Sequence, residues 1–218
     1  MNQLEPITQT QLFGLEKYMN EFIKLNSMKK FPNKILLTGN KGVGKSTLAY
    51  HYINHVLSQD EDFQYDAENF KINPNNHSFK ITLNKTNPNF HLIDLNFEKK
   101  KIDISQIREL ISILSKSSFN KKPRFILIDN IEYLNINSIN ALLKIIEEPS
   151  KNIYFILINN NKKILKTLLS RCINFKIFLS NFESIRVSNK LFDDKLDQFI
   201  NKDLINYYQS PGNIYNLI

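Results

Sequence analysis

The segment from Lys34 to Leu57 constrains the fold of this chain more than any other. It opens with the short apolar run KILLT, continues with the loop GNKGVGKS at 39–46, and ends with apolar residues at helical spacing. Closely spaced glycines let successive backbone amides turn toward an anion, and a Lys-Ser pair after them is typical of a phosphate-binding loop. The order strand, loop, helix predicts an α/β domain with a nucleotide site.

Each residue of this loop has an expected role. We expect the backbone at Gly39, Gly42 and Gly44 to cradle phosphates. Lys45 would reach the terminal phosphates of ATP, and the Ser46 hydroxyl would bind Mg²⁺. Thr47 completes the expected nucleotide site. The alternative is a loop that keeps this shape and holds no ligand.

Further apolar runs predict strands that alternate with helices. This alternation favours a parallel sheet with helices on both faces and ligands at the carboxyl ends of the strands. The polar segment 60–88 is expected to form loops, with room for a short helix. The further strands are expected at 90–95, 123–130, 153–159 and 173–179, and the helices at 12–25, 44–57, 104–115, 138–148 and 163–170.

The pattern changes after Ser180, where only helices are expected. They cover 182–192 and 196–209, and a third begins after the SPG of 210–212. We therefore predict a nucleotide-binding domain at 1–179 and a small, incomplete helical lid at 180–218.

Asp129 ends the apolar strand FILI, where a carboxylate can hold Mg²⁺ through water or simply cap a turn. ATPases with this layout usually have a glutamate next, but here the residue is Asn130, whose amide cannot accept a proton from water. Glu132 could replace that glutamate only if its loop folds back. Asn159 and Asn160 end the next strand, and either could sense the terminal phosphate or close a turn. Hydrolysis by this chain is left open.

Arg171 follows a short helix and precedes a strand in the run LLSRC. An exposed guanidinium there could stabilise charge on a phosphate of a neighbouring subunit, as an arginine finger, or could form a surface salt bridge. Glu147 and Glu148 end a helix before Pro149 and are interpreted as a solvated pair. The residues alone leave both roles of Arg171 open.

The composition excludes several further kinds of protein and of binding site. A single cysteine excludes an internal disulfide and a multi-cysteine zinc module. The sequence has no apolar run of 18 residues and no signal-peptide pattern, so no membrane role is expected and a cytoplasmic location is the default. A net charge of +8 suits nucleic-acid contact, although abundant Lys, Asn and Ile would also follow from an A+T-rich genome.

The motifs FPNKILLTGNKGVGKST, NPNFHLID, ISQIRELI, FILIDNIEYLN, NALLKIIEEPS and LLSRC together resemble the AAA+ subunits of bacterial DNA polymerase III clamp loaders, in particular the delta-prime branch. The resemblance implies a P-loop AAA+ domain followed by a helical lid. It further implies that Arg171 completes the ATP site of an adjacent subunit. The implied partners are gamma/tau and delta subunits, a sliding clamp reached indirectly, and primer-template DNA contacted through the assembly.

Several departures from that family shape the functional hypothesis. Asn130 departs from the hydrolysing gamma/tau subunits and fits the delta-prime branch, whereas Asn213 stands where relatives often carry a nucleotide-sensing arginine. No zinc is expected, and the helical collar domain of the relatives is expected to be absent. The leading hypothesis is a delta-prime-like subunit that binds ATP weakly or without hydrolysis. The alternatives are a gamma/tau-like ATPase and, with few supporting arginines, a P-loop nucleotide kinase.

Overall fold

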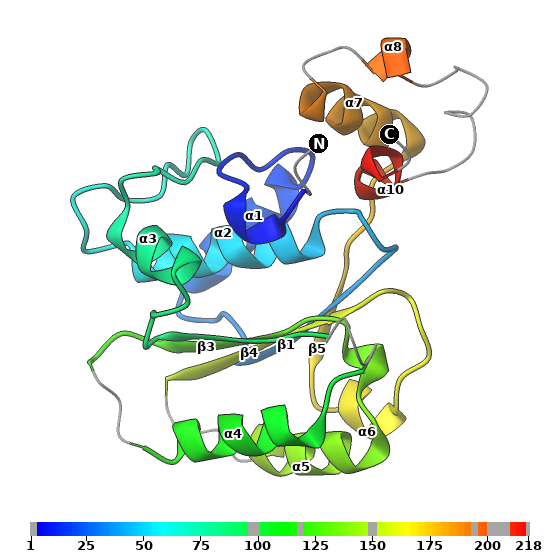
Figure 1. Cartoon of the computed structure of the whole chain (residues 1–218). Helices are drawn as coiled ribbons and strands as arrows, with labels where there is room; N and C mark the ends of the chain where they lie inside the picture. Colours follow the sequence, from blue (N-terminus) through cyan, green and yellow to red (C-terminus); the bar gives the residue numbers. More distant parts are fainter. Residues whose placement is uncertain are drawn as a thin grey trace. The chain divides into compact units, whose positions relative to one another are not determined.

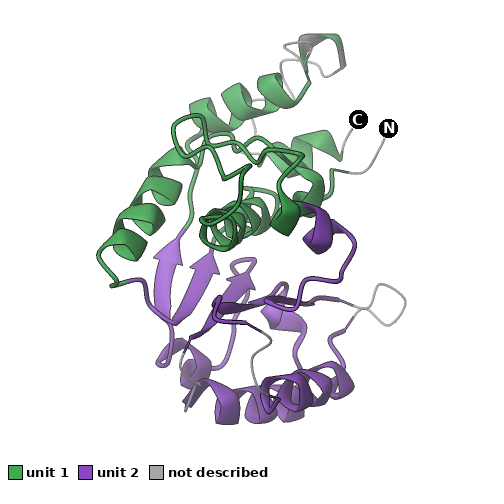
Figure 2. Cartoon of the chain, turned by 90° about the vertical axis from the view of Figure 1, so that its left-hand side faces the viewer, with its two compact units in different colours: residues 1–30, 39–79, 177–218 green, residues 31–38, 80–176 purple. Residues whose placement is uncertain are grey.

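The computed structural model describes residues 4–95, 101–116, 120–147, 152–192, 196–199 and 210–216. The chain divides into two compact units, each assembled from separate stretches of sequence (Figure 2). Unit 1 comprises 1–30, 39–79 and 177–218, and unit 2 comprises 31–38 and 80–176. The phosphate-loop sequence therefore belongs to unit 1, and the strand before it belongs to unit 2.

Unit 2 is built on a parallel sheet of five strands in the order β2-β3-β4-β1-β5. Each pair of neighbouring strands is parallel, with Leu36 of β1 opposite Leu157 of β4 and Asn174 of β5. The parallel sheet that the alternating pattern predicts is confirmed. The strands are β1 (Lys34–Thr38), β2 (Phe90–Ile93), β3 (Arg124–Ile128), β4 (Ile153–Asn159) and β5 (Ile173–Lys176).

Helices α4 (Ile104–Leu114) and α5 (Ile136–Glu147) lie side by side on one face of this sheet (Figure 1). Both have an apolar stripe that packs into one cluster with the strands, since residues three and four apart share a helix face. α4 starts at the predicted capping box, in which the Asp103 amide donates to Gln106 Oε1 at 2.9 Å. The short elements of this unit are η2 (Ile131–Tyr133) and α6 (Lys166–Leu169).

Unit 1 contains most of the remaining helices. In it the Phe22 and Tyr52 rings of α1 and α2 meet edge to face, with centroids 5.4 Å apart. α7 begins at a second capping box, formed by Ser180 and Glu183, and α10 packs against α7. α3 crosses from unit 1 into unit 2. These elements are η1 (Pro6–Thr8), α1 (Glu16–Ser27), α2 (Lys45–Leu57), α3 (His77–Leu83), α7 (Asn181–Leu191), α8 (Leu196–Phe199) and α10 (Pro211–Tyr215).

The main differences from the predicted elements lie at their ends. α1 starts at Glu16 instead of Leu12, because Gly14 has a left-handed φ of 76°. The last strand stops at Lys176, three residues early. α10 starts at Pro211, within the SPG, because the Ser210 side chain caps it. Most of the helix predicted at 196–209, as well as Glu148 and Pro149, lies outside the described residues.

Candidate functional site

The loop between β1 and α2 has the conformation that its glycines permit. Gly42 and Gly44 have φ angles of 83° and 93°, values that side-chain-bearing residues rarely adopt. Gly44 is the residue before α2, and the helix starts there without a side-chain cap. Because Gly44 has no side chain that could occupy this end of the helix, the start of α2 suits an anion.

Lys45, the first residue of α2, points back into its own loop. It is only 3% exposed, and its Nζ donates to the carbonyl oxygens of Gly39 at 2.8 Å and Asn40 at 2.7 Å. A buried ammonium needs such acceptors because burial without a partner is costly. Lys45 is thus held against the backbone of its own loop.

The start of α10 lies directly on this loop within unit 1. Ser210 Oγ donates to the Lys41 carbonyl at 2.5 Å, and the Gly212 amide donates to the Gly42 carbonyl at 2.9 Å. A β-carbon at Gly42 would lie 2.9 Å from the Asn213 nitrogen and 3.2 Å from the Gly212 Cα. Gly42 thus serves both its own turn and the close approach of α10.

In unit 2, side chains at the carboxyl ends of β2, β3 and β4 form one hydrogen-bonded cluster. Asn130 Nδ2 donates to Asp94 Oδ1 at 2.7 Å, and Asn130 Oδ1 accepts from Asn160 Nδ2 at 2.8 Å. Asn160 Nδ2 also donates to Glu132 Oε1 at 2.9 Å. Asn130 has a left-handed φ of 57°, which asparagine tolerates better than glutamate. Both ends of its amide are therefore engaged inside the protein.

Asp129 and Glu132 lie on either side of Asn130. Asp129 is partly buried at the end of β3, and its Oδ1 accepts from the backbone N–H of Asn130 at 2.7 Å. The Glu132 loop folds back toward β4, since Oε2 also accepts from the Asn160 amide nitrogen at 3.4 Å. Glu132 therefore lies in the same cluster as Asn130, and its role in placing water stays a prediction.

Asn159 closes a turn. Its Nδ2 donates to the Lys162 carbonyl at 2.9 Å, its Oδ1 accepts from the Lys162 amide at 3.2 Å, and the residue is 4% exposed. This is the second of the two roles that the sequence left open. Its neighbour Asn160, whose side chain contacts Asn130 and Glu132, is the polar residue that the structure brings into the cluster.

Arg171 follows α6 on the surface of unit 2. Its Nη2 forms an ion pair of 2.6 Å with Glu147 Oε1, and its Nη1 donates to the Thr167 carbonyl at 2.8 Å. Glu147 is half exposed, as expected of a solvated carboxylate, and it also pairs with Arg171. The adjacent Cys172 packs against the core, and burial raises the pKa of its thiol to about 11, so the thiol stays protonated at neutral pH.

A family model described as DNA polymerase III, delta subunit, matches residues 14–180 of this chain. The chain belongs to that delta-subunit family. Its fold is the P-loop α/β fold of AAA+ proteins. The solved RuvB Holliday junction branch migration motor of Thermotoga maritima shares this fold, with a TM-score of 0.50 at 16% identity over 87% of this chain and 56% of RuvB.

Two curated relatives of this family member represent the two branches that the sequence suggested. The DNA polymerase III subunit delta' of Buchnera aphidicola subsp. Baizongia pistaciae is 30% identical over 171 residues, which cover 75% of this chain and 49% of the relative. The subunit gamma of Buchnera aphidicola subsp. Schizaphis graminum is 37% identical over 83 residues, which cover 38% and 23% of the two chains. The chain spans about half the length of the delta' relative.

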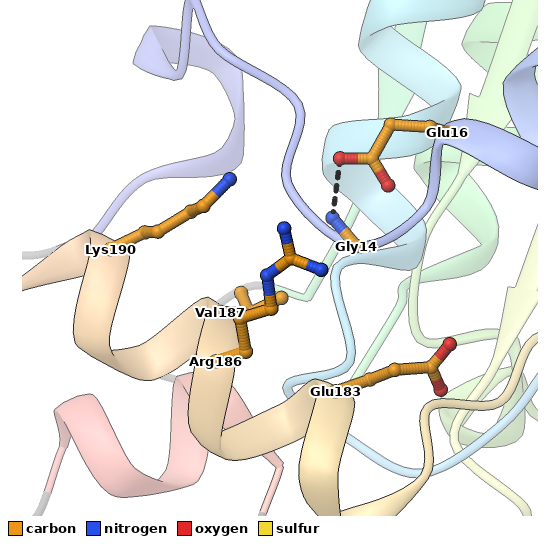
Figure 3. A pocket seen from close by; sticks show the side chains of 6 residues that line it. All are labelled: Gly14, Glu16, Glu183, Arg186, Val187 and Lys190. Carbon is orange, nitrogen blue, oxygen red and sulfur yellow. Dashed lines mark hydrogen bonds between the residues drawn. The ribbon is translucent and has the colours of Figure 1, made fainter.

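The structure also has a pocket that none of the predicted site residues line. It is a hollow of about 200 Å³ in unit 1, between the chain just before α1 and one face of α7 (Figure 3). Glu16 in its wall accepts a hydrogen bond from the Gly14 amide at 2.9 Å. The wall mixes both signs of charge, so it favours no single class of ligand. Its lining residues are Gly14, Glu16, Glu183, Arg186, Val187 and Lys190.

Among the described residues, no three His, Cys, Asp or Glu side chains gather as a metal site. No helix in the described ranges has the length and apolar content needed to cross a membrane. The Mg²⁺ site at Ser46 and Asp129 stays a prediction.

Asp94 in the cluster and Glu147 beside Arg171 are the contact residues that the sequence did not predict. A signal for Asp94 exists, because β2 and β3 both run into the sequence Leu-Ile-Asp and parallel neighbours end at the same edge. Asn160 was predicted, together with Asn159, as a candidate phosphate sensor. No signal in the sequence pairs Glu147 with Arg171, which is 24 positions away along the chain.

Proposed function

We propose that this chain is a clamp-loader subunit of the delta-prime kind. It binds ATP without hydrolysing it and provides Arg171 to the ATP site of an adjacent subunit. Membership of the DNA polymerase III delta-subunit family and 30% identity to a delta' subunit support this assignment. The chain would act in the cytoplasm, beside gamma/tau and delta subunits.

The observation that carries the proposal is the state of Asn130. This residue lacks the carboxylate that would accept a proton from attacking water, and its amide is bonded to Asp94 and Asn160. Exchanging these partners for water would break two hydrogen bonds at a partly buried site. Asn130 is therefore a structural link between strands, which favours binding without turnover.

The nucleotide would be held by the loop and its neighbours. We assign nucleotide contacts to the backbone from Gly39 to Gly44, to Lys45 and to Thr47, with Ser46 and Asp129 nearest to the metal. Mg²⁺ would neutralise phosphate charge there. The buried position of Lys45 and the positive φ angles of the loop support this assignment. Asn159 would act through the turn that it closes.

Partners follow from this role. A sliding clamp would be reached only through the assembly, and primer-template DNA would be contacted mainly through its backbone. The net charge of +8 supports such contact, which would weaken as salt concentration rises.

The test is reconstitution of the loader with its cognate subunits. Arg171→Ala should lower DNA-stimulated ATP turnover by roughly tenfold or more, since trans-acting arginines stabilise charge in the transition state. Arg171→Lys should not restore it, because lysine lacks the planar fork. Arg186→Ala is the matched control, an exposed arginine of α7. Unchanged turnover with Arg171→Ala would reject the finger.

A gamma/tau-like ATPase is the second candidate, and one observation favours it. The Glu132 carboxylate shares the Asn160 amide with Asn130, so a carboxylate is present in the cluster. The purified chain would then hydrolyse ATP above background, and both Glu132→Gln and Lys45→Ala would abolish the activity. Absence of turnover by the purified chain rejects this candidate.

A further inference from the structure

Arg171 has two described partners, and they come from different helices. Glu147 is the last residue of α5, and Thr167 belongs to α6. The arginine and glutamate side chains are 35% and 49% exposed, so the ion pair lies at the surface and not in the core. Exposed ion pairs contribute little to folding stability. The ion pair therefore acts mainly on the orientation of the guanidinium.

Two contacts from different directions define that orientation. A guanidinium has five N–H donors, and the described partners use one on Nη1 and one on Nη2. The remaining donors can bind phosphate oxygens while the two anchoring bonds persist. An unrestrained arginine side chain samples many rotamers, and it loses this rotamer freedom when it binds a ligand. Fixing the side chain in advance removes that cost from the catalytic step.

The position of Glu147 at the end of α5 is electrostatically unfavourable. A carboxylate at the carboxyl end of a helix faces the negative end of the helix dipole, where a cation is preferred. The Arg171 guanidinium offsets this unfavourable placement.

We propose that Glu147 is the positioning residue of Arg171: it holds the guanidinium in the pose that reaches the ATP of the adjacent subunit. This inference rests on the proposed function. It adds that a residue on α5 sets the efficiency of a finger located after α6.

The experiment measures DNA-stimulated ATP turnover of the reconstituted loader with variants of this chain. Glu147→Ala should lower kcat about three- to tenfold and leave KM for ATP unchanged, because misplacement of a catalytic group affects the chemical step. Glu147→Gln retains an oxygen that can accept from Nη2 and should restore at least half of the turnover. Glu109→Ala removes one exposed carboxylate from α4, a residue with no described ion pair to Arg171, and should match the wild type.

The double variant distinguishes positioning from a general structural effect. In an Arg171→Ala background, Glu147→Ala should cause no further loss, because the group that it positions is gone. A further loss there would overturn the inference. So would an unchanged kcat for Glu147→Ala in a loader that Arg171→Ala impairs, and the proposed function would then stand. If Arg171→Ala itself has no effect, the proposed function fails and the positioning role fails with it.

Discussion

At the scale of single residues, His51 predicts how stability depends on pH. The ring is buried in unit 1 between Tyr65 OH, 3.1 Å from Nδ1, and the Gln9 carbonyl, 3.1 Å from Nε2. A carbonyl can only accept, so Nε2 carries the proton and the neutral ring satisfies both partners. Burial lowers the pKa of His51 from 6.5 to about 4.

Because the folded pKa lies below the unfolded value, the contribution of His51 is complete above pH 6.5 and is lost as the pH falls toward 4. We expect the free energy of unfolding to drop by about 2 kcal/mol between pH 7 and pH 5 from this residue. Urea unfolding at both pH values measures it. His51→Gln should flatten the change, and the exposed His77→Gln should not. An equal drop in His51→Gln would contradict the assignment.

The sequence predicted which residues form the candidate site, but it did not predict the contacts between their side chains. Lys45 and the loop glycines have the conformations that the motif requires. The link between Asn130 and Asp94 was not foreseen, because it joins strands 36 positions apart through sheet order. Side-chain contacts of this kind depend on register and rotamers, which periodicity does not encode.

At the scale of elements, Gly212 predicts how α10 is attached. A β-carbon there would lie 2.9 Å from the Gly42 Cα and 3.1 Å from the Gly42 carbonyl oxygen, both backbone atoms that cannot rotate away. Gly212→Ala should therefore separate α10 from the phosphate loop and break the bond from the Gly212 amide to the Gly42 carbonyl. We expect the amide of residue 212 to exchange with deuterium about tenfold faster or more.

Asn213→Ala is the matched control for this prediction, since Asn213 is exposed in the same turn and keeps its backbone amide. Protection at residue 212 should be unchanged in that variant. If Gly212→Ala also leaves the exchange rate unchanged, the close approach of the two backbones is not required for the attachment of α10.

Element types followed from the sequence, whereas their ends depended on local bonds. The period of apolar residues specified the five strands and the stripes of α4 and α5. The start of α1 was shifted by Gly14, whose amide donates to Glu16 Oε1 and whose φ is left-handed. The start of α10 was shifted by Ser210. Capping choices of this kind are made by single side chains and not by periodicity.

At the scale of the whole molecule, the two units are not continuous in sequence. Residues 177–218 group with 1–30 and 39–79, whereas 31–38 group with 80–176. The boundary predicted after residue 179 came from a change of pattern along the chain and stays a prediction. A linear pattern cannot reveal that strand β1 and the loop after it belong to different units, because grouping in space depends on long-range packing.

Binding of ATP should raise the thermal stability of the entire chain. A ligand that binds only the folded state at about a hundred times its Kd adds about 2.7 kcal/mol to the free energy of unfolding. For a chain of this size, that corresponds to a rise in Tm of roughly 5–10 °C. Differential scanning fluorimetry with and without Mg-ATP measures the shift, and removal of Mg²⁺ by EDTA should reduce it.

The variant that decides this prediction is Lys45→Ala, which removes the ammonium held inside the loop. The shift in Tm should disappear, because backbone amides alone would face the charge of the phosphates. Lys24→Ala removes an exposed charge from α1 and should leave the shift intact. A shift that persists in Lys45→Ala would mean that ATP binds elsewhere. Wild-type protein with no shift at millimolar Mg-ATP would mean that the loop keeps its shape and has lost its ligand.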